Sequence, residues 1–198
     1  MTTAAADSSA NMKKIVRLGA VLFTVTAITG MILGAVNEIT REPIRRTQAR
    51  LREEALAMSL PEADGFESVE VTGAGAMIKG IDEGRKGGLP AGYCITVSSP
   101  GYGGPIEVVV GITESGGLRA ISILSQSETP GLGAKAAAPA FSGQFSNKGG
   151  SRLSVVKGGG AAPDQIEAIS GATITSQAVT SGVNAALEYW RDNLKGRD

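Results

Sequence analysis

The feature that most constrains this chain is a run of nineteen uncharged residues, "LGAVLFTVTAITGMILGAV", from Leu18 to Val36. As a helix rising about 1.5 Å per residue it is about 28 Å long, close to the roughly 30 Å hydrocarbon core of a bilayer. A cleaved signal peptide has a shorter apolar run, of about 7 to 15 residues, before a small-residue cleavage site. A soluble helix that is apolar on all faces needs more apolar partners than the remaining chain offers. The run therefore predicts a retained transmembrane helix, assigned to residues 13–36.

The charges that flank this run do not decide its orientation. Lys13, Lys14 and Arg17 precede it, and five arginines follow it between residues 41 and 52. A literal count of positive charges places the C-terminal domain in the cytoplasm, but the rule is weak when a long domain follows the span. Both topologies therefore stay open on charge alone.

The rest of the chain divides into three parts. Residues 1–12 are small and polar without periodicity, which predicts a disordered tail. Residues 37–60 predict an amphipathic stalk helix, with Pro43 near its start and Pro61 past its end. Residues 61–198 predict one globular domain. The positions expected on the stalk's less polar stripe are Ile44, Gln48, Leu51, Ala55 and Met58.

Within that domain, apolar residues alternate over 93–97 and 106–112, which predicts two strands. The five residues "TESGG" then predict a hairpin loop. The phase of the apolar residues slips within 118–124, which suggests a bulge or a strand buried on both faces. Another strand is expected in "RLSVVKG" (152–158). A closing helix is expected to bury Val179, Val183, Ala186, Leu187 and Trp190. The order predicts an α+β fold with a mainly antiparallel sheet and packing helices.

Composition excludes several kinds of site. The chain has no histidine, which excludes a Ser-His-Asp triad, a Cys-His pair and any histidine-ligated zinc or haem site. Its one cysteine, Cys94, lies in an expected strand, where a buried and inert thiol is favoured. Nineteen basic residues balance nineteen acidic ones, and no basic tract favours binding to nucleic acid. We expect no metal site and no catalytic residue.

Hydroxyl groups are crowded into "ISGATITSQAV", residues 169–179. One interpretation is a glycine turn before a helix, with Thr175 or Ser176 capping the first-turn amides. Another is that a threonine here accepts a phosphate ester, since free amides at a helix start favour phosphate. A helix N-terminus contributes only about 0.3 to 1 kcal/mol to a bound anion, and about 2 at best. That is about a thirtyfold gain in affinity, so a phosphorylated cofactor on an exposed domain is retained better by a covalent bond.

Three stretches together resemble one family. They are "SPGYGGPIEVVVGI" (99–112), "SETPGLGAK" (127–135) and "SGAT" (170–173), in this order after a single anchor. The chain resembles the FMN-binding subunits of ion-pumping complexes: the G subunit of the Rnf complex and, less closely, the C subunit of the sodium-pumping quinone reductase. In this family FMN is joined through its phosphate to the threonine of the third stretch.

The resemblance implies a covalent FMN on Thr173, with Thr175 as the nearby rival. Ser170, Gly171 and Ala172 are then expected to form the turn around the phosphate. The residues expected to line the ribityl chain and ring are Glu128, Thr129, Gly131, Leu132 and Gly133. Those expected to form an adjacent loop are Gly101, Tyr102 and Gly103.

Three further positions bear on this site. Lys157 is a candidate to balance the phosphate charge, although a surface lysine is the simpler interpretation. The chain departs from the family at Glu167, where the motif usually has Asp, and at Gln126, where many members have His.

The function that the resemblance implies is electron transfer within an ion-translocating complex running between ferredoxin and NAD. The implied partners are the other membrane and redox subunits and a flavin transferase that attaches the cofactor. It also implies a single-pass protein of the cytoplasmic membrane, with the N-terminus in the cytoplasm and the domain outside. A different class of function stays open, which is a membrane-tethered binding or scaffold domain without a cofactor.

Overall fold

The computed structural model describes residues 3–71, 73, 75–149, 152–159 and 162–196. The chain forms two compact units, residues 1–49 and 50–198. One helix, α1 (Thr3–Ser59), carries the apolar run and contains Pro43 in its interior. Pro43 was expected near the start of a separate helix, and that expectation was wrong; Pro61 does follow the helix end. Residues 3–12 of the expected disordered tail are helical, as part of α1, and residues 1 and 2 lie outside the described residues. The borders at residues 12, 36 and 60 remain predictions.

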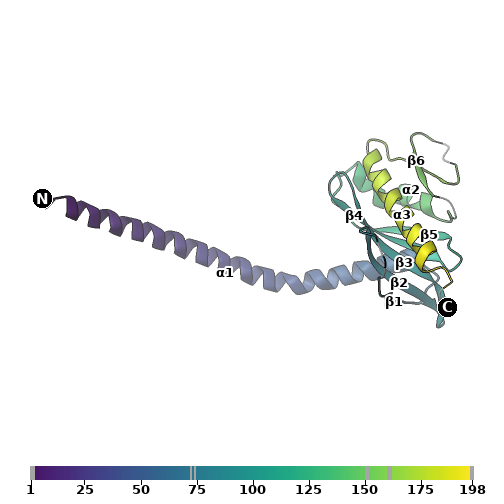
Figure 1. The fold of residues 1–198 in the computed structure, drawn as a ribbon, viewed down its shortest axis with the longest axis horizontal. Coiled ribbons are helices and arrows are strands. Elements are labelled where there is room, and N and C mark those ends of the chain that lie inside the picture. Colours follow the sequence, from purple (N-terminus) through teal and green to yellow (C-terminus); the bar gives the residue numbers. More distant parts are fainter. Residues whose placement is uncertain (1–2, 72, 74, 150–151, 160–161, 197–198) are drawn as a thin grey trace. The chain divides into compact units, whose positions relative to one another are not determined.

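The first unit contains the part of α1 with the properties of a membrane span. Within the described residues, α1 is long and apolar enough to cross a bilayer, with a mean hydropathy of 2.0 in its most apolar window. The hydroxyls of Thr24, Thr26 and Thr29 each donate to the carbonyl four residues earlier, at 2.8 to 3.0 Å. These bonds satisfy the polar groups inside the helix, as an apolar environment requires. Figure 1 shows α1 from purple to blue.

The second unit is built on a five-stranded antiparallel sheet. Its strands occur in chain order, each paired with its neighbour. They are β1 (Gly65–Val69), β2 (Ile78–Lys86), β3 (Leu89–Pro100), β4 (Pro105–Thr113) and β5 (Leu118–Ser125). The "TESGG" hairpin joins β4 to β5, and the register shifts near Ile112 and Leu118, so the hairpin and the bulge are confirmed. The α+β class with a mainly antiparallel sheet is also confirmed.

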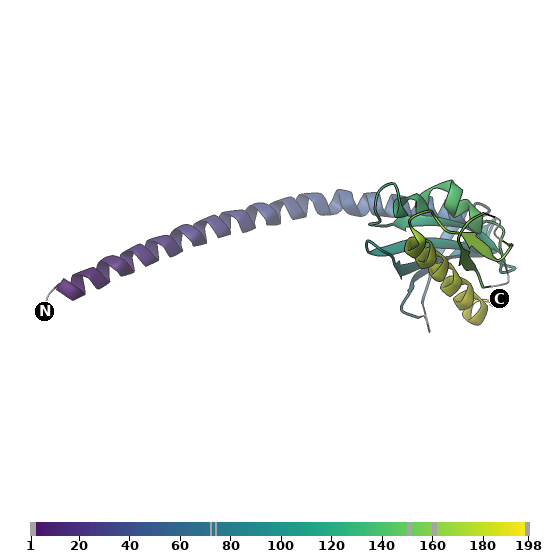
Figure 2. The same ribbon diagram turned by 90° about the horizontal axis from the view of Figure 1, so that it is seen from above.

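Helix α3 (Thr173–Asn193) covers one face of this sheet. Figures 1 and 2 show it in yellow, lying across the strands. The five residues expected on its apolar stripe are all buried, and they join one core with the inward residues of β3 and β4. The core is dense because β-branched residues dominate these strands and pack well on a pleated surface.

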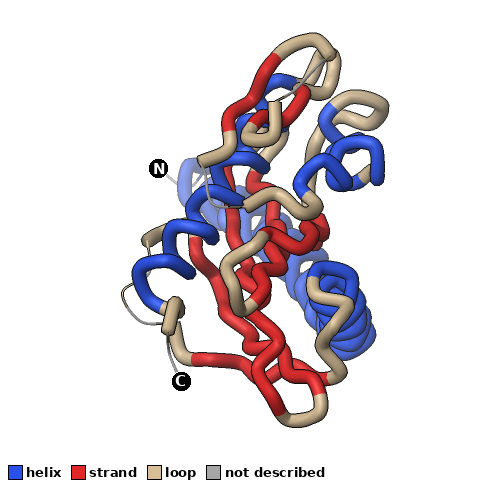
Figure 3. The backbone as a smooth tube through the Cα atoms, turned by 90° about the vertical axis from the view of Figure 1, so that its right-hand side faces the viewer, coloured by secondary structure: helices blue, strands red, loops and turns tan. Residues whose placement is uncertain are grey.

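The last turns of α1 cover the opposite face, as the tube in Figure 3 makes clear. Ala55, Leu56 and Leu60 form a second core with Cys94 and Val109. Of the positions expected on the stalk's stripe, only Ala55 is buried, and the exposed ones are Ile44, Gln48, Leu51 and Met58. The predicted stripe is therefore not the buried face of the helix, because Leu56 and Leu60 supply the buried contacts instead.

Two tight contacts fix α1 on the sheet. Arg52 donates to both carboxylate oxygens of the buried Asp82, at 3.0 and 2.8 Å. A side-chain carbon on Gly111 of β4 would lie 1.9 Å from the carbonyl oxygen of Ser59, so only glycine allows this approach. The end of α1 is thus an integral part of the second unit.

The remaining elements connect β5 to α3. They are η1 (Gly133–Ala137), α2 (Pro139–Ser142), η2 (Gly143–Phe145), β6 (Ser154–Val156) and β7 (Gln165–Glu167). The strand expected in "RLSVVKG" is confirmed as β6, but it pairs in parallel with β7 in a separate two-stranded sheet. Strands β1 and β2 were not predicted, since their apolar residues do not alternate cleanly.

Candidate functional site

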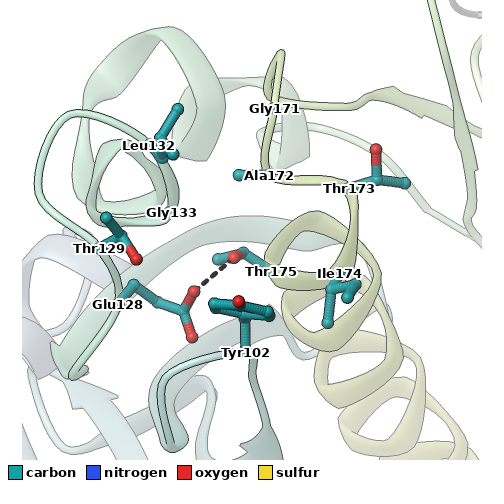
Figure 4. Close-up of a pocket in the computed structure, with 10 residues that line it drawn as sticks. All are labelled: Tyr102, Glu128, Thr129, Leu132, Gly133, Gly171, Ala172, Thr173, Ile174 and Thr175. Carbon is teal, nitrogen blue, oxygen red and sulfur yellow. Dashed lines mark hydrogen bonds between the residues drawn. The ribbon is translucent and has the colours of Figure 1, made fainter.

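A pocket of about 490 Å³ lies where three separate segments meet. These segments are the β3–β4 turn, the loop from β5 into η1, and the start of α3 (Figure 4). Its size falls within the range of about 300 to 1,000 Å³ that is common for ligand sites. The lining residues are Tyr102, Glu128, Thr129, Leu132, Gly133, Gly171, Ala172, Thr173, Ile174 and Thr175.

Glu128 is the acidic residue of this lining, and only 6% of it is exposed. Its Oε1 accepts a hydrogen bond from the amide of Gly103 at 2.9 Å, and its Oε2 accepts one from the Thr175 hydroxyl at 2.6 Å. Burial acts to raise the pKa of Glu128, but these bonds and one from the Tyr102 amide lower it below its ordinary value. Glu128 is therefore a fixed negative charge in the pocket.

Two glycines make room for this arrangement. A side-chain carbon on Gly133 would lie 2.4 Å from Oε2 of Glu128 and 2.6 Å from the Thr175 hydroxyl. Gly171 has a φ of 76°, a conformation that favours glycine and that turns the chain into α3. The glycines of the second and third motifs thus allow loop and helix to close around the carboxylate.

The start of α3 does not use a side-chain cap. Its N-cap is Ala172, and no side chain there bonds the first-turn amides. Ser176 instead accepts from the Ile169 amide at 3.0 Å and donates to the Ala172 carbonyl at 3.0 Å. The interpretation of Thr175 or Ser176 as a cap was therefore wrong, because both hydroxyls are held by other partners. The first amides of α3 are left without an intrahelical acceptor.

The two candidate threonines differ in their surroundings. Thr175 is 1% exposed and its hydroxyl bonds Glu128. Thr173 is half-buried at the pocket edge, and its hydroxyl makes no hydrogen bond within the part of the chain that the structure describes. In Figure 4 Thr173 projects from the start of α3, away from the Glu128–Thr175 pair. Of the two, only Thr173 has a hydroxyl open to a ligand.

The structure brings together nine of the thirteen predicted site residues as pocket lining. The other four are Ser170, Gly131, Gly101 and Gly103, which belong to the same three segments without lining the pocket. Ile174 was missed, although its place after the threonine of the motif, on the first turn of the helix, was a usable signal. The roles of these residues remain predictions.

The other positions singled out in the sequence lie outside the lining. Lys157 is exposed and does not line the pocket. The side-chain oxygen of Gln126 accepts from the Glu128 amide at 2.6 Å and so steadies the loop. The amide of Glu167 donates to the Gln144 side chain at 2.7 Å. Cys94 is fully buried, as expected. Within the described residues, no cluster of three or more acidic residues or cysteines has metal-site geometry.

The second unit is an antiparallel sheet with a helix across it and an open pocket at the start of that helix. Residues 101–188 match the family model of the FMN-binding domain. The pocket fits that cofactor, because free helix amides and an open hydroxyl suit a phosphate and the remaining volume suits a larger group.

Relatives identify the family more closely. The G subunit of the proton-translocating ferredoxin:NAD(+) oxidoreductase complex of Clostridium ljungdahlii is 38% identical over 81% of this chain and 83% of its own. The G subunit of the Na(+)-translocating ferredoxin:NAD(+) oxidoreductase complex of Acetobacterium woodii is 33% identical over 92% of this chain and 95% of its own. The chain belongs to the family of G subunits of these ion-translocating, Rnf-type complexes.

A solved structure supports the fold. The C subunit of the Na(+)-translocating NADH-quinone reductase from Parabacteroides distasonis is similar with a TM-score of 0.52. The two are 26% identical, and the match covers 60% of this chain and 64% of that one. The resemblance stated from the sequence is thus confirmed.

Proposed function

We propose that this chain carries FMN as a phosphate ester on Thr173 and relays electrons within an ion-translocating ferredoxin:NAD oxidoreductase complex. The flavin supplies the redox chemistry, and the protein supplies position and charge. A flavin phosphoryl group passes from an activated flavin nucleotide donor to the Thr173 oxygen, which loses its proton, and the rest of the donor leaves with the broken phosphate bond. The product has the mass of the chain plus FMN less one water. A flavin transferase forms the ester bond. The bound flavin then exchanges electrons with the other membrane and redox subunits of the complex.

The observation that supports Thr173 is the contrast between the two hydroxyls. The Thr175 hydroxyl is enclosed and donates to a carboxylate at 2.6 Å, so an incoming phosphate meets a negative charge there. Thr173 lies at the first position of α3, beside amides that lack an intrahelical acceptor. A phosphate on Thr173 is therefore close to hydrogen-bond donors and at the edge of the pocket farther from the carboxylate.

Substitution of the two threonines tests the attachment site. After co-expression with the matching flavin transferase, the wild-type band is expected to fluoresce on a denaturing gel, and Thr173→Ala is expected to be dark. Thr175→Val, which keeps the side-chain shape, is the matched control and is expected to fluoresce. Intact mass should differ from the unmodified chain by one FMN less one water.

Two other results would change the conclusion. The reverse pattern, with fluorescence lost only in Thr175→Val, would reassign the ester to Thr175. A dark wild-type band would favour the alternative, a tethered binding or scaffold domain.

We also propose that the apolar part of α1 anchors the chain in the cytoplasmic membrane, with the N-terminus inside and the domain outside. The apolar helix supports the anchor, and the orientation rests on the family resemblance because charge leaves it open. A C-terminal alkaline phosphatase fusion is expected to be active, since that reporter matures only outside the cytoplasm. An inactive fusion that is present at normal level would reverse the proposed orientation.

A further inference from the structure

The pocket contains one feature that flavin attachment does not require, which is the buried carboxylate of Glu128. It comes from the loop after β5 and is hydrogen-bonded to Thr175 on the first turn of α3 (Figure 4). The other nine lining residues include no Lys, Arg or Asp, so no lining cation offsets its charge. A bound ligand therefore meets a negative charge that no lysine or arginine of the lining balances.

The geometry holds this carboxylate in place. The Gly103 amide and the Thr175 hydroxyl bind different oxygens of the group, at 2.9 and 2.6 Å. Gly101 and Gly133 approach so closely that a side-chain carbon on either would lie 2.4 Å from a carboxylate oxygen. The side chain has no room to swing toward solvent and screen its charge, because backbone and helix enclose it.

Such a charge has a defined effect on a redox group. Each electron added to a flavin makes it more negative, and a nearby fixed anion opposes that change. The opposition is greatest where little water screens it, as in a pocket whose carboxylate is 6% exposed. Charge placed near a cofactor is one of the main ways in which a protein tunes it.

The charge also bears on the orientation of the cofactor. The phosphate is an anion and is favoured at the free amides of α3 rather than beside Glu128. With the phosphate held at Thr173 on the pocket edge, the rest of the cofactor extends into a pocket whose lining includes the carboxylate. The redox-active ring of the cofactor is therefore the part exposed to the electric field of the Glu128 carboxylate.

We propose that Glu128 sets the reduction potential of the bound flavin and holds it low, with Thr175 moderating the carboxylate charge. This inference rests on the proposed function, since it needs a flavin in this pocket. The alternative is a purely structural role, in which Glu128 only connects the loop to α3. The reduction potential of the flavin would then not depend on the charge of Glu128.

The test compares full-length chains that have been loaded by the transferase. Fluorescence on a denaturing gel first shows whether each chain carries flavin, and a redox titration then measures its midpoint potential. The pH is kept about three units above the ordinary pKa of Glu. Glu128→Gln keeps the shape and removes the charge. This substitution is expected to shift the one-electron equilibrium at least tenfold toward the reduced flavin. The midpoint potential then rises by about 59 mV or more.

The matched control is Glu114→Gln, which removes the same charge from the exposed hairpin at the far end of β4. Its midpoint is expected to equal that of the wild type, because exposed charges beyond about 10 Å are screened. A second variant, Thr175→Val, keeps the carboxylate and removes one donor that offsets its charge. Its midpoint is expected to fall.

The outcomes separate this inference from the proposed function. A loaded Glu128→Gln chain with an unchanged or lower midpoint would overturn the role of Glu128 and leave flavin attachment intact. A folded Glu128→Gln chain that takes up no flavin would also overturn it, since the carboxylate would then be a binding group. Should Glu128→Gln fail to fold, a midpoint in Thr175→Val equal to or above the wild-type value would overturn it. A wild-type chain without flavin would instead refute the proposed function.

Discussion

At the scale of single residues, the pocket depends on two threonines two positions apart on α3. Successive helical residues are rotated by about 100°, so positions 173 and 175 point to nearly opposite sides. One hydroxyl therefore lies at the open edge of the pocket, and the other meets Glu128 inside. The rotation of the helix therefore gives the two hydroxyls different surroundings.

Glu128 predicts a dependence of stability on pH. Its pKa is lowered in the folded state from an ordinary value of 4.5, so it stabilises the fold above that pH. This contribution is lost as the pH falls through the folded value. In urea titrations at a series of acidic pH values, the free energy of unfolding should decline less steeply for Glu128→Gln than for the wild type. Glu114→Gln should follow the wild type, and equal slopes for all three would contradict the prediction.

Cys94 predicts an unreactive thiol. Burial, and then the negative charge of Asp82, raise its pKa to about 12. At pH 8, about four units lower, only about one thiol in ten thousand is the reactive thiolate. Iodoacetamide is expected to leave the native chain unlabelled and to label it fully in urea, as intact mass will show. Rapid labelling of the native chain would mean that the end of α1 opens readily from the sheet.

At the scale of elements, the contact between α1 and β4 depends on Gly111. A methyl group there would overlap the Ser59 carbonyl, and overpacking of this kind costs about 1 to 3 kcal/mol. Gly111→Ala is therefore expected to lower the free energy of unfolding by that amount in urea titrations. Gly65→Ala is the matched control, because a side-chain carbon on this strand glycine meets nothing within 4 Å. Its change should stay within about 0.5 kcal/mol, and equal effects would show that Gly111 is not a contact point.

Strands and helices differ in how far the sequence predicted them. β3, β4 and α3 alternate or repeat their apolar residues clearly, and each was predicted close to its observed position. β1 and β2 were missed because pairing with a neighbour, not their own pattern, stabilises them. The stripe of α1 was misassigned since only the sheet decides which side of a charged helix is buried.

At the site, the motifs predicted the three segments, but the buried Glu128–Thr175 bond depends on tertiary packing.

At the scale of the whole molecule, the second compact unit begins at Arg50, whereas the border after residue 60 remains a prediction. A fragment of residues 50–198 is expected to be soluble and to fold. A fragment of residues 61–198 lacks Leu56 and Leu60, whose burial contributes about 1.5 to 3 kcal/mol each. It also leaves the buried Asp82 without its arginine; breaking a fully buried pair costs about 3 to 5 kcal/mol, and the loss is smaller here because the Arg52 side chain is 44% exposed.

Circular dichroism melts of the two fragments test this border. The shorter fragment is expected to melt at a clearly lower temperature or to be unfolded at 25 °C, because its losses are comparable with the total stability of a typical domain, about 5 to 15 kcal/mol. Equal melting temperatures would show that the end of α1 is dispensable and would support the border at residue 60.

The close contact between the Ser59 carbonyl and Gly111 has a practical consequence for protein engineering. A designer who wishes to transplant this flavin carrier onto another tether must splice before residue 50 and keep the native register from there onward. Inserting one residue between Arg52 and Ser59 would turn the arginine by about 100° and so separate the two anchoring contacts from each other.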